Sequence, residues 1–132
     1  MGLIVDTGVL IRLERDPRYI DFATYERFGE AYICAITASE LLVGVHRANT
    51  EERRLKRSAF VESVLRDLPA LTFDLETARV HAQLVSALPR HVTLGAHDLI
   101  IGATAVRQGF PVLTTNEADF RRMPGCQVET PL

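Results

Sequence analysis

Short apolar runs alternate with helix-forming segments along this chain, and that alternation is the feature that most restricts its fold. The runs expected to form buried strands are Gly2–Asp6, Tyr32–Ile36, Leu71–Phe73, Val112–Thr114 and a fifth at Gln127–Glu129. The segments between them carry apolar residues at helical spacing. Strands that alternate with helices pair in parallel, so the sequence predicts an α/β fold with helices on both faces of the sheet.

Start and stop signals divide the intervening segments into separate helices. Thr50 and Asp74 suit N-cap positions, and Gly109 with Pro111 ends the helix before them. The expected helices are Thr7–Arg15, Pro17–Gly29, one that begins at Thr37, Thr50–Leu68, Leu75–Leu88, Ala96–Gln108 and Glu117–Arg122. In Thr50–Leu68 we expect an apolar stripe made by Leu55, Phe60, Val64 and Leu68.

Size and composition exclude several classes of protein. A chain of 132 residues, 47% of them hydrophobic, is long enough for one domain with its own core, which we place at residues 1–132, and is too apolar for intrinsic disorder. The net charge of −2 means that any nucleic-acid role must rest on local patches. Cys34 and Cys126 lack zinc-site spacing, which suggests reduced residues. No apolar run approaches ~20 residues and the chain starts without a basic region, so we expect a soluble, cytoplasmic protein without membrane contact.

Four acidic residues fall where we expect a strand to give way to a helix: Asp6, Glu40, Asp98 and Asp119. The carboxyl ends of parallel strands meet at one edge of the sheet, where ligands bind. Two carboxylates gathered there repel each other by roughly 4 kcal/mol at ~4 Å and an effective dielectric of ~20. A hard divalent ion would offset this repulsion. Mg²⁺ and Mn²⁺ prefer such oxygen ligands, and they lower the pKa of a bound water and stabilise the oxygens of a phosphoryl displacement.

Each acid also has a purely structural alternative. Asp6 suits a helix N-cap, and Asp98 would complement a helix dipole. Glu40 fits a capping box that begins at Thr37, and Asp119 fits an ordinary helix start. The joint occurrence of the four acids at one predicted sheet edge favours a site over four unrelated caps.

Four stretches of the sequence resemble PIN-domain ribonucleases of the VapC toxin type. They occur in chain order and span most of the chain: Ile4–Thr7, Ile36–Val45, Ala96–Ala105 and Val112–Phe120. The resemblance implies a three-layer α/β/α fold with a central, mostly parallel sheet of four to five strands. It also implies a Mg²⁺- or Mn²⁺-dependent endoribonuclease that acts as the toxin of a toxin–antitoxin pair. Its substrate would be RNA, in exposed tRNA or rRNA loops.

The same resemblance implies partners and site residues. The partners are a second copy of the chain in a homodimer and a small cognate antitoxin in a hetero-oligomer, with DNA contacted only through the antitoxin. The catalytic, metal-binding acids of the family pattern fall on Asp6, Glu40 and Asp98, with the more variable fourth on Asp119 or at the position of Asn116. Residues expected to orient ligands, water or substrate are Thr7, Thr114 and Asn116.

Basic side chains near the acids leave two interpretations open. His97 precedes Asp98 and is placed to assist proton transfer or contact a phosphate, but adjacent helical residues point about 100° apart, which disfavours a direct catalytic role. The densest basic cluster (Arg53, Arg54, Lys56 and Arg57) is either a solvated helix face or a contact for RNA or antitoxin. The same choice applies to the arginines nearest the acids in sequence, which are Arg12, Arg15, Arg121 and Arg122.

Three other classes of protein compete with the nuclease. The triplet Asp6–Gly8 matches retroviral-type aspartic proteases, but those are all-β and this chain reads as largely helical. Receiver domains need a phospho-acceptor Asp on a central strand and a partner lysine, which the predicted strands do not supply. A PIN-like module that binds RNA or a partner without cutting it stays open. Mg²⁺-dependent cleavage of RNA that is lost in Asp6→Asn would separate the nuclease from this binding module.

Overall fold

Adjacent residues of the central strand point to opposite faces of the sheet, and each face has its own core. In the computed structural model, which describes residues 1–131, β1 spans Gly2–Val5. Leu3 and Val5 lie in one buried cluster and Ile4 lies in the other. Because β1 is buried on both faces, it reads as a continuous apolar run and must lie inside a sheet covered on both sides.

Five strands form one parallel sheet in the order β3-β2-β1-β4-β5. The other four strands are β2 (Glu30–Cys34), β3 (Ala70–Leu71), β4 (Val112–Leu113) and β5 (Val128–Glu129). After β3 the chain crosses to the opposite side of β1, so the carboxyl ends of β1 and β4 form the switch point where ligands bind in such folds. The predicted number of strands and their parallel pairing are confirmed.

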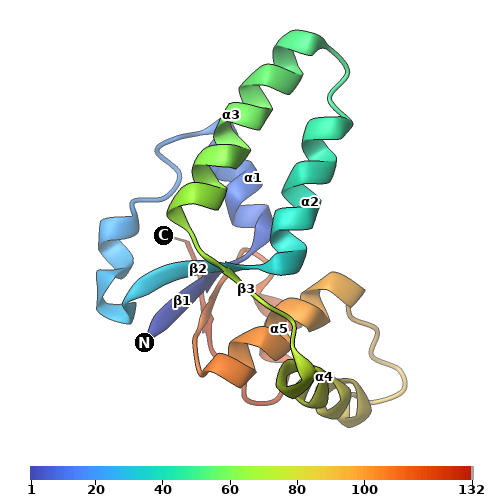
Figure 1. The fold of residues 1–132 in the computed structure, drawn as a ribbon. Helices are drawn as coiled ribbons and strands as arrows, with labels where there is room; N and C mark the ends of the chain where they lie inside the picture. The colour runs from blue at the N-terminus through green and yellow to red at the C-terminus, as the bar shows by residue number, and fades with distance from the viewer. Residues whose placement is uncertain (132) are drawn as a thin grey trace.

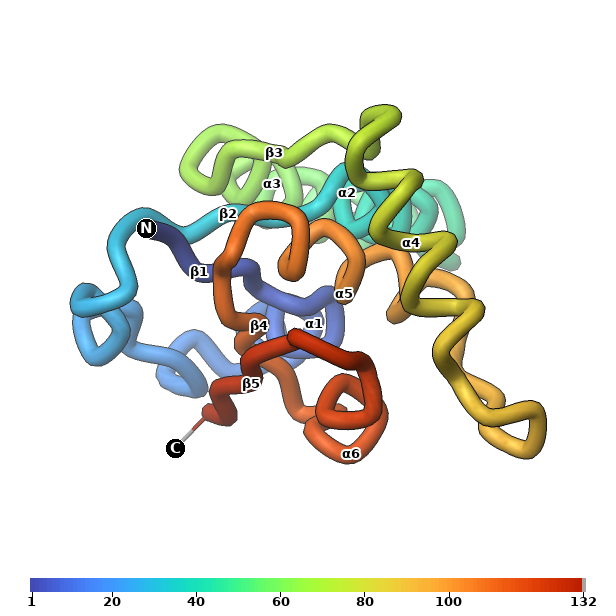
Figure 2. Tube along the Cα trace, turned by 90° about the horizontal axis from the view of Figure 1, so that it is seen from below, coloured from blue at the N-terminus to red at the C-terminus, as the bar shows by residue number. Residues whose placement is uncertain are grey.

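Helices cover both faces of the sheet (Figures 1 and 2). On the Leu3 face lie α1 (Thr7–Arg15), the 3₁₀ helix η1 (Phe22–Phe28), α2 (Ala35–His46) and α3 (Glu51–Asp67). On the Ile4 face lie α4 (Leu75–Ala87), α5 (Ala96–Gln108) and α6 (Glu117–Arg121). This is the predicted three-layer α/β/α arrangement. No helix within residues 1–131 is both long and apolar enough to cross a bilayer.

Several helix boundaries follow from the signals in the sequence. The Thr50 hydroxyl oxygen accepts the Arg53 N–H at 3.1 Å, and Asp74 Oδ1 accepts the Thr77 N–H at 2.9 Å, so both residues cap their helices as predicted. Helix α5 has the predicted bounds and ends at Gly109, whose φ of 74° is left-handed. Of the two cysteines, both free, Cys34 is buried and Cys126 is half-buried.

The predicted boundary between the second strand and its helix was wrong by two residues. We expected a strand over Tyr32–Ile36 and a helix from Thr37, whereas β2 ends at Cys34 and α2 begins at Ala35. The pairing register accounts for the difference. Gly2 of β1 pairs with Glu30, so β2 begins and ends two residues earlier than predicted. Thr37 therefore lies inside α2, and the capping box proposed for Glu40 does not exist.

The predicted helix over Pro17–Gly29 was also wrong. Asp16 starts a turn in which its side chain accepts the Arg18 N–H at 3.0 Å and its carbonyl accepts the Tyr19 N–H at 2.9 Å. The turn does not continue into a helix, because Asp21 has extended backbone and its side chain starts a new turn by accepting the Ala23 N–H at 3.1 Å. Only the 3₁₀ helix η1 follows, capped by Asp21 and with Tyr25 buried.

Two further differences come from where the sheet ends. The third strand is Ala70–Leu71 and not Leu71–Phe73, because its partner β2 stops at Cys34. Leu55 is 62% exposed and takes no part in the predicted stripe of α3. Figure 1 shows that α2 and α3 form a long hairpin that extends beyond the sheet, and Leu55 belongs to the N-terminal part of α3.

Substitution of Gly109 tests how the helix that carries Asp98 is terminated. A Cβ at Gly109 would meet no atom within 4 Å, so Gly109→Ala adds backbone strain without a clash. We expect it to lower the free energy of unfolding by about 1 kcal/mol, as measured by urea denaturation. Asn tolerates the left-handed conformation, so Gly109→Asn should lose less. Equal stability of the Ala variant and the native protein would contradict this account.

Candidate active site

The parallel pairing of β1 with β4 places Asp6 beside Thr114. Val5 pairs with Leu113, and the Asp6 N–H donates to the Leu113 carbonyl at 2.9 Å. The carboxylate of Asp6 then bridges two elements: Oδ1 accepts the Thr7 N–H at 2.8 Å and Oδ2 accepts the Thr114 hydroxyl at 2.7 Å. Asp6 is therefore the N-cap of α1, as the structural alternative predicted, and its second oxygen is directed at the neighbouring strand.

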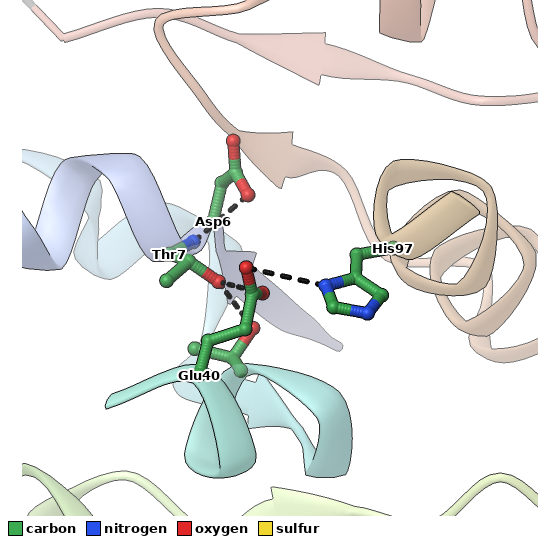
Figure 3. A network of polar contacts seen from close by, with 5 residues as sticks. Asp6, Thr7, Glu40 and His97 are labelled. Atoms are coloured by element: carbon green, nitrogen blue, oxygen red, sulfur yellow. Dashed lines mark hydrogen bonds and ion pairs between the residues drawn. The ribbon is translucent and has the colours of Figure 1, made fainter. Parts of the chain in front are cut away.

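Glu40 reaches the same place from α2 and is held by two side chains (Figure 3). Its Oε1 lies 2.9 Å from the Thr7 hydroxyl, which also lies 3.0 Å from the Thr37 hydroxyl. Because a carboxylate only accepts, Thr7 donates its single hydroxyl proton to Glu40 and accepts from Thr37. The other oxygen, Oε2, lies 3.3 Å from His97 Nδ1.

Asn116 links the remaining two acids. Its side-chain Nδ2 donates to Asp98 Oδ2 at 3.1 Å and to Asp119 Oδ2 at 3.0 Å. Its backbone N–H donates to the Thr114 hydroxyl at 2.9 Å. Asn116 thus holds both carboxylates through one amide group, and Thr114 connects this pair to Asp6.

The seven residues singled out from the sequence belong to one hydrogen-bonded arrangement. Thr7, Thr114 and Asn116 each contact an acid directly, and their proposed roles as orienting residues stay predictions. Sequence reasoning missed Thr37, which it took for a helix cap. Its spacing of three residues before Glu40 would have placed it on the same face of the helix if the helix start had been correct.

One of the four acids does not lie at the end of a strand. Asp98 does not follow a strand: it lies in the first turn of α5, after α4 and a connecting loop. The expectation that all four acids mark ends of strands was wrong here. Asp98 joins the site because α5 packs on the Ile4 face of the sheet and Asn116, which follows β4, donates to the carboxylate in its first turn.

Burial and mutual repulsion both act on the central carboxylates. The pKa of Asp6 is raised chiefly by burial, and the charges of Asp98 and Glu40 raise it further against the opposing bonds from Thr114 and Thr7. The pKa of Asp98 is also raised, first by burial and then by Asp119 and Glu40, while Asn116 and His97 oppose this. The charge of each acid therefore acts on its neighbours and disfavours joint ionisation.

The donor set fits a hard divalent cation in chemistry and in charge. All four acids offer oxygen ligands, and within residues 1–131 none of them forms an ion pair with Lys or Arg. In that same part of the chain, no three His, Cys, Asp or Glu side chains lie close enough together to hold one ion as they stand. Any ion shared by three of these acids would therefore require their side chains to move closer.

Most of the basic residues noted in the sequence are occupied elsewhere. Arg57 pairs with Glu14, and Arg12 lies over the Tyr19 ring at 4.5 Å. The neighbours of Arg57 on α3 pair within their own helix, Arg54 with Glu51 and Lys56 with Glu52. Arg121, the neighbour of the fourth acid, pairs with Glu117. The solvated-face interpretation suits these side chains better than contact with the acids.

The chain is similar in sequence and in fold to known proteins. A family model described as PIN domain matches residues 3–125. Ribonuclease VapC1 of Rickettsia felis is 40% identical over 131 residues, which cover 98% of this chain and 96% of the relative. The tRNA(fMet)-specific endonuclease VapC of Salmonella typhimurium is 34% identical, with 98% and 97% covered. A crystal structure of DNA-bound VapBC from Salmonella typhimurium contains a chain that superposes with a TM-score of 0.86 at 28% identity, with 98% of each chain covered.

Replacement of Thr7 by valine should expose the role of its hydroxyl. The substitution keeps the shape of the side chain but leaves Glu40 Oε1 and the Thr37 hydroxyl without this partner. We expect the free energy of unfolding to fall by about 1–3 kcal/mol, as measured by urea denaturation. Thr7→Ser keeps the hydroxyl and should stay closer to the native protein. A Ser variant as unstable as the Val variant would show that the methyl group, and not the hydrogen bonds, matters.

Substitution of Asp98 should change the pH dependence of stability. An acid with a raised folded pKa stabilises the protein below its unfolded value, here 3.8, and that contribution is lost as the pH rises through the folded pKa. In metal-free buffer, Asp98→Asn should leave the melting temperature at neutral pH unchanged or raised and should flatten its decline above about pH 4.

Asp74 supplies a control of opposite sign, because bonds from Thr77 hold the pKa of its carboxyl below the ordinary value. Its contribution to stability is present above the unfolded pKa and is lost as the pH falls through the folded pKa. Asp74→Asn should therefore lower stability at neutral pH. A loss of more than ~1 kcal/mol in Asp98→Asn would instead favour the helix-dipole role of Asp98.

Proposed function

The chain belongs to the PIN-domain family, and from that premise we propose that it is an endoribonuclease that acts as the toxin of a toxin–antitoxin pair. The observation that carries the proposal is the hydrogen-bonded arrangement of Asp6, Glu40, Asp98 and Asp119 at the switch point of the sheet. Relatives named ribonuclease and tRNA(fMet)-specific endonuclease, which match nearly the whole chain, support it.

The proposed cofactor is Mg²⁺, with Mn²⁺ as a substitute, held by the four acids. When bound, such an ion supplies a water of lowered pKa and stabilises the charge that develops on phosphate oxygens. The support is the all-oxygen donor set and the uncompensated charge of the acids. The chemistry is hydrolysis of a phosphodiester bond, in which water is the nucleophile.

The surrounding side chains favour water over a nucleophile from the protein. The Thr7 and Thr114 hydroxyls already donate to carboxylates, so they are fixed as positioning groups. Cys34 is the thiol nearest in sequence to Glu40. Burial raises the pKa of Cys34 to about 12, which keeps it protonated and unreactive at neutral pH. His97 lies against Glu40 and is placed to hold a proton or a substrate oxygen beside that carboxylate.

The substrate and the partners follow the same proposal. We infer that the substrate is RNA cut in exposed single-stranded loops, such as those of tRNA or rRNA. The proposed assembly is a homodimer that is held inactive by a small antitoxin in a hetero-oligomer, and it contacts DNA only through the antitoxin. Support comes from the fold, which superposes on chains from three complexes titled VapBC, VapBC2 and FitAB, all three of them described as bound to DNA. A cytoplasmic location is consistent with this role.

A PIN-like module that binds RNA or a partner without cutting it is the alternative. The chain keeps all four acids, and it keeps the Thr and Asn side chains that hold them. In the absence of a cation, this concentration of uncompensated carboxylates would repel a phosphate backbone and so weaken RNA binding by a non-catalytic module. The enzyme is therefore favoured.

Cleavage of RNA with and without metal tests the proposal. We expect Mg²⁺ to support cleavage of end-labelled tRNA, EDTA to abolish it, and Asp98→Asn to slow it by on the order of 100-fold or more. Mg²⁺ should also raise the melting temperature of the native protein and barely change that of Asp98→Asn.

Asp74→Asn is the matched control, because it makes the same chemical change at the N-cap of α4 and should cut RNA at the native rate. Cleavage by Asp98→Asn at the native rate, or full activity in EDTA, would contradict the metal-dependent mechanism. Tight RNA binding without any cleavage would favour the binding module.

A further inference from the structure

A groove with polar and apolar lining leads from the acidic site along α2 to the end of that helix. Glu40, Gly44 and Arg47 are spaced by four and three residues, which places them on one face of the helix. The groove has a volume of about 460 Å³, and its lining includes these three residues together with Thr7, Ile11 and His97. A strand bound at the acids has this open path beside it.

Arg47 is a cation without an assigned role at the far end of the groove. It is exposed and ends α2, and its backbone N–H donates to the Val43 carbonyl at 3.0 Å. Within residues 1–131 its side chain takes part in no ion pair, hydrogen bond or aromatic contact. Arg57 differs from Arg47 in this respect, because its guanidinium pairs with Glu14 and donates to the Gly44 carbonyl at 3.0 Å.

We propose that Arg47 binds a backbone phosphate of the RNA strand on one side of the bond that is cut; the inference rests on the proposed nuclease function. Seven helical residues rise about 10 Å, so Arg47 lies too far from Glu40 to contact the reacting phosphate and faces a neighbouring one. A guanidinium binds phosphate through two parallel N–H donors, which gives direction as well as charge. Arg47 is therefore a positioning residue that sets the path of the strand.

The composition of the groove favours RNA over a protein partner at this position. An adjoining cavity of about 200 Å³ near α3 shares Ile11, Glu40 and Gly44 with the groove, but its own lining of Leu41, Phe60 and Val61 suits an apolar side chain, and its Arg57 already pairs with Glu14. The groove toward Arg47 also has apolar side chains, those of Ile11 and Val43. It adds the hydroxyls of Thr7 and Ser39, the His97 imidazole and the Arg47 guanidinium, which forms no ion pair within residues 1–131. Those groups match sugar and phosphate oxygens.

Binding of a fluorescein-labelled single-stranded oligoribonucleotide tests the inference without cleavage. In an Asp98→Asn background, Arg47→Ala should raise Kd by about five- to tenfold and reduce the slope of log Kd against log salt by about 0.7, the value for one lost phosphate contact on a single strand. Arg47→Lys should keep the slope and recover part of the affinity, since it retains the charge but not the paired donors. Arg79→Ala removes the same charge from α4 at an exposed position and should change neither quantity.

Cleavage kinetics separate positioning from chemistry. In the otherwise native chain, Arg47→Ala should raise KM severalfold and leave kcat close to the native value, because the lost contact holds the substrate equally in the ground and transition states. The melting temperature should stay the same, since the backbone hydrogen bond of Arg47 is kept.

The outcomes distinguish this inference from the proposed function. If the native chain cuts RNA while Arg47→Ala leaves Kd, slope and KM unchanged, the inference is overturned and the function stands. If Arg47→Ala weakens RNA binding but the native chain cuts no RNA, the phosphate contact stands and the nuclease function is overturned. If Arg47→Ala weakens only the complex with purified antitoxin, the groove belongs to a protein partner and the inference is overturned.

Discussion

The pairing of β1 with β4 is the constraint on which the rest of the site depends. Both strands stop at the same level of the sheet, since Val5 pairs with Leu113, and the next residue of each is polar. Asp6 and Thr114 consequently meet across the switch point, where one residue of slippage would turn both side chains to the opposite face. The buried apolar residues that precede them fix this register, so the core that stabilises the fold also positions the first acid.

Neutral groups, and not cations, hold the acids in place. Hydroxyls of Thr7 and Thr114 and the amide of Asn116 donate to the carboxylates without cancelling their charge. An arginine at any of these positions would hold a carboxylate as firmly and would remove the negative potential that a cation needs. Burial, and then the charges of neighbouring acids, raise the pKa of Asp6 and of Asp98, and at neutral pH this is a loss of stability that the buried core must offset.

The sequence predicted the ends of helices correctly where a single residue determines them. Gly109 ends α5 because the chain there takes the left-handed backbone conformation, which glycine adopts without strain. Asp74 and Thr50 start their helices by capping them with their own side chains. Prediction failed where a distant strand decides. The start of α2 depends on how β2 pairs with β1, and that error produced the false capping box and concealed Thr37. The turn at Asp16 is a second kind of failure, because it depends on local hydrogen bonds that a helical pattern of apolar residues does not reveal.

The sequence by itself determined the layers of the fold, the parallel sheet and the identity of the four acids, because apolar periodicity and residue chemistry are local properties. Only the tertiary structure decided that Asn116 joins Asp98 to Asp119 and that Arg47 shares a groove with Glu40. These relations depend on packing between elements that lie far apart along the chain. Spacing along the sequence gives the face of a helix or strand on which a residue lies, but it does not give the element against which that face packs.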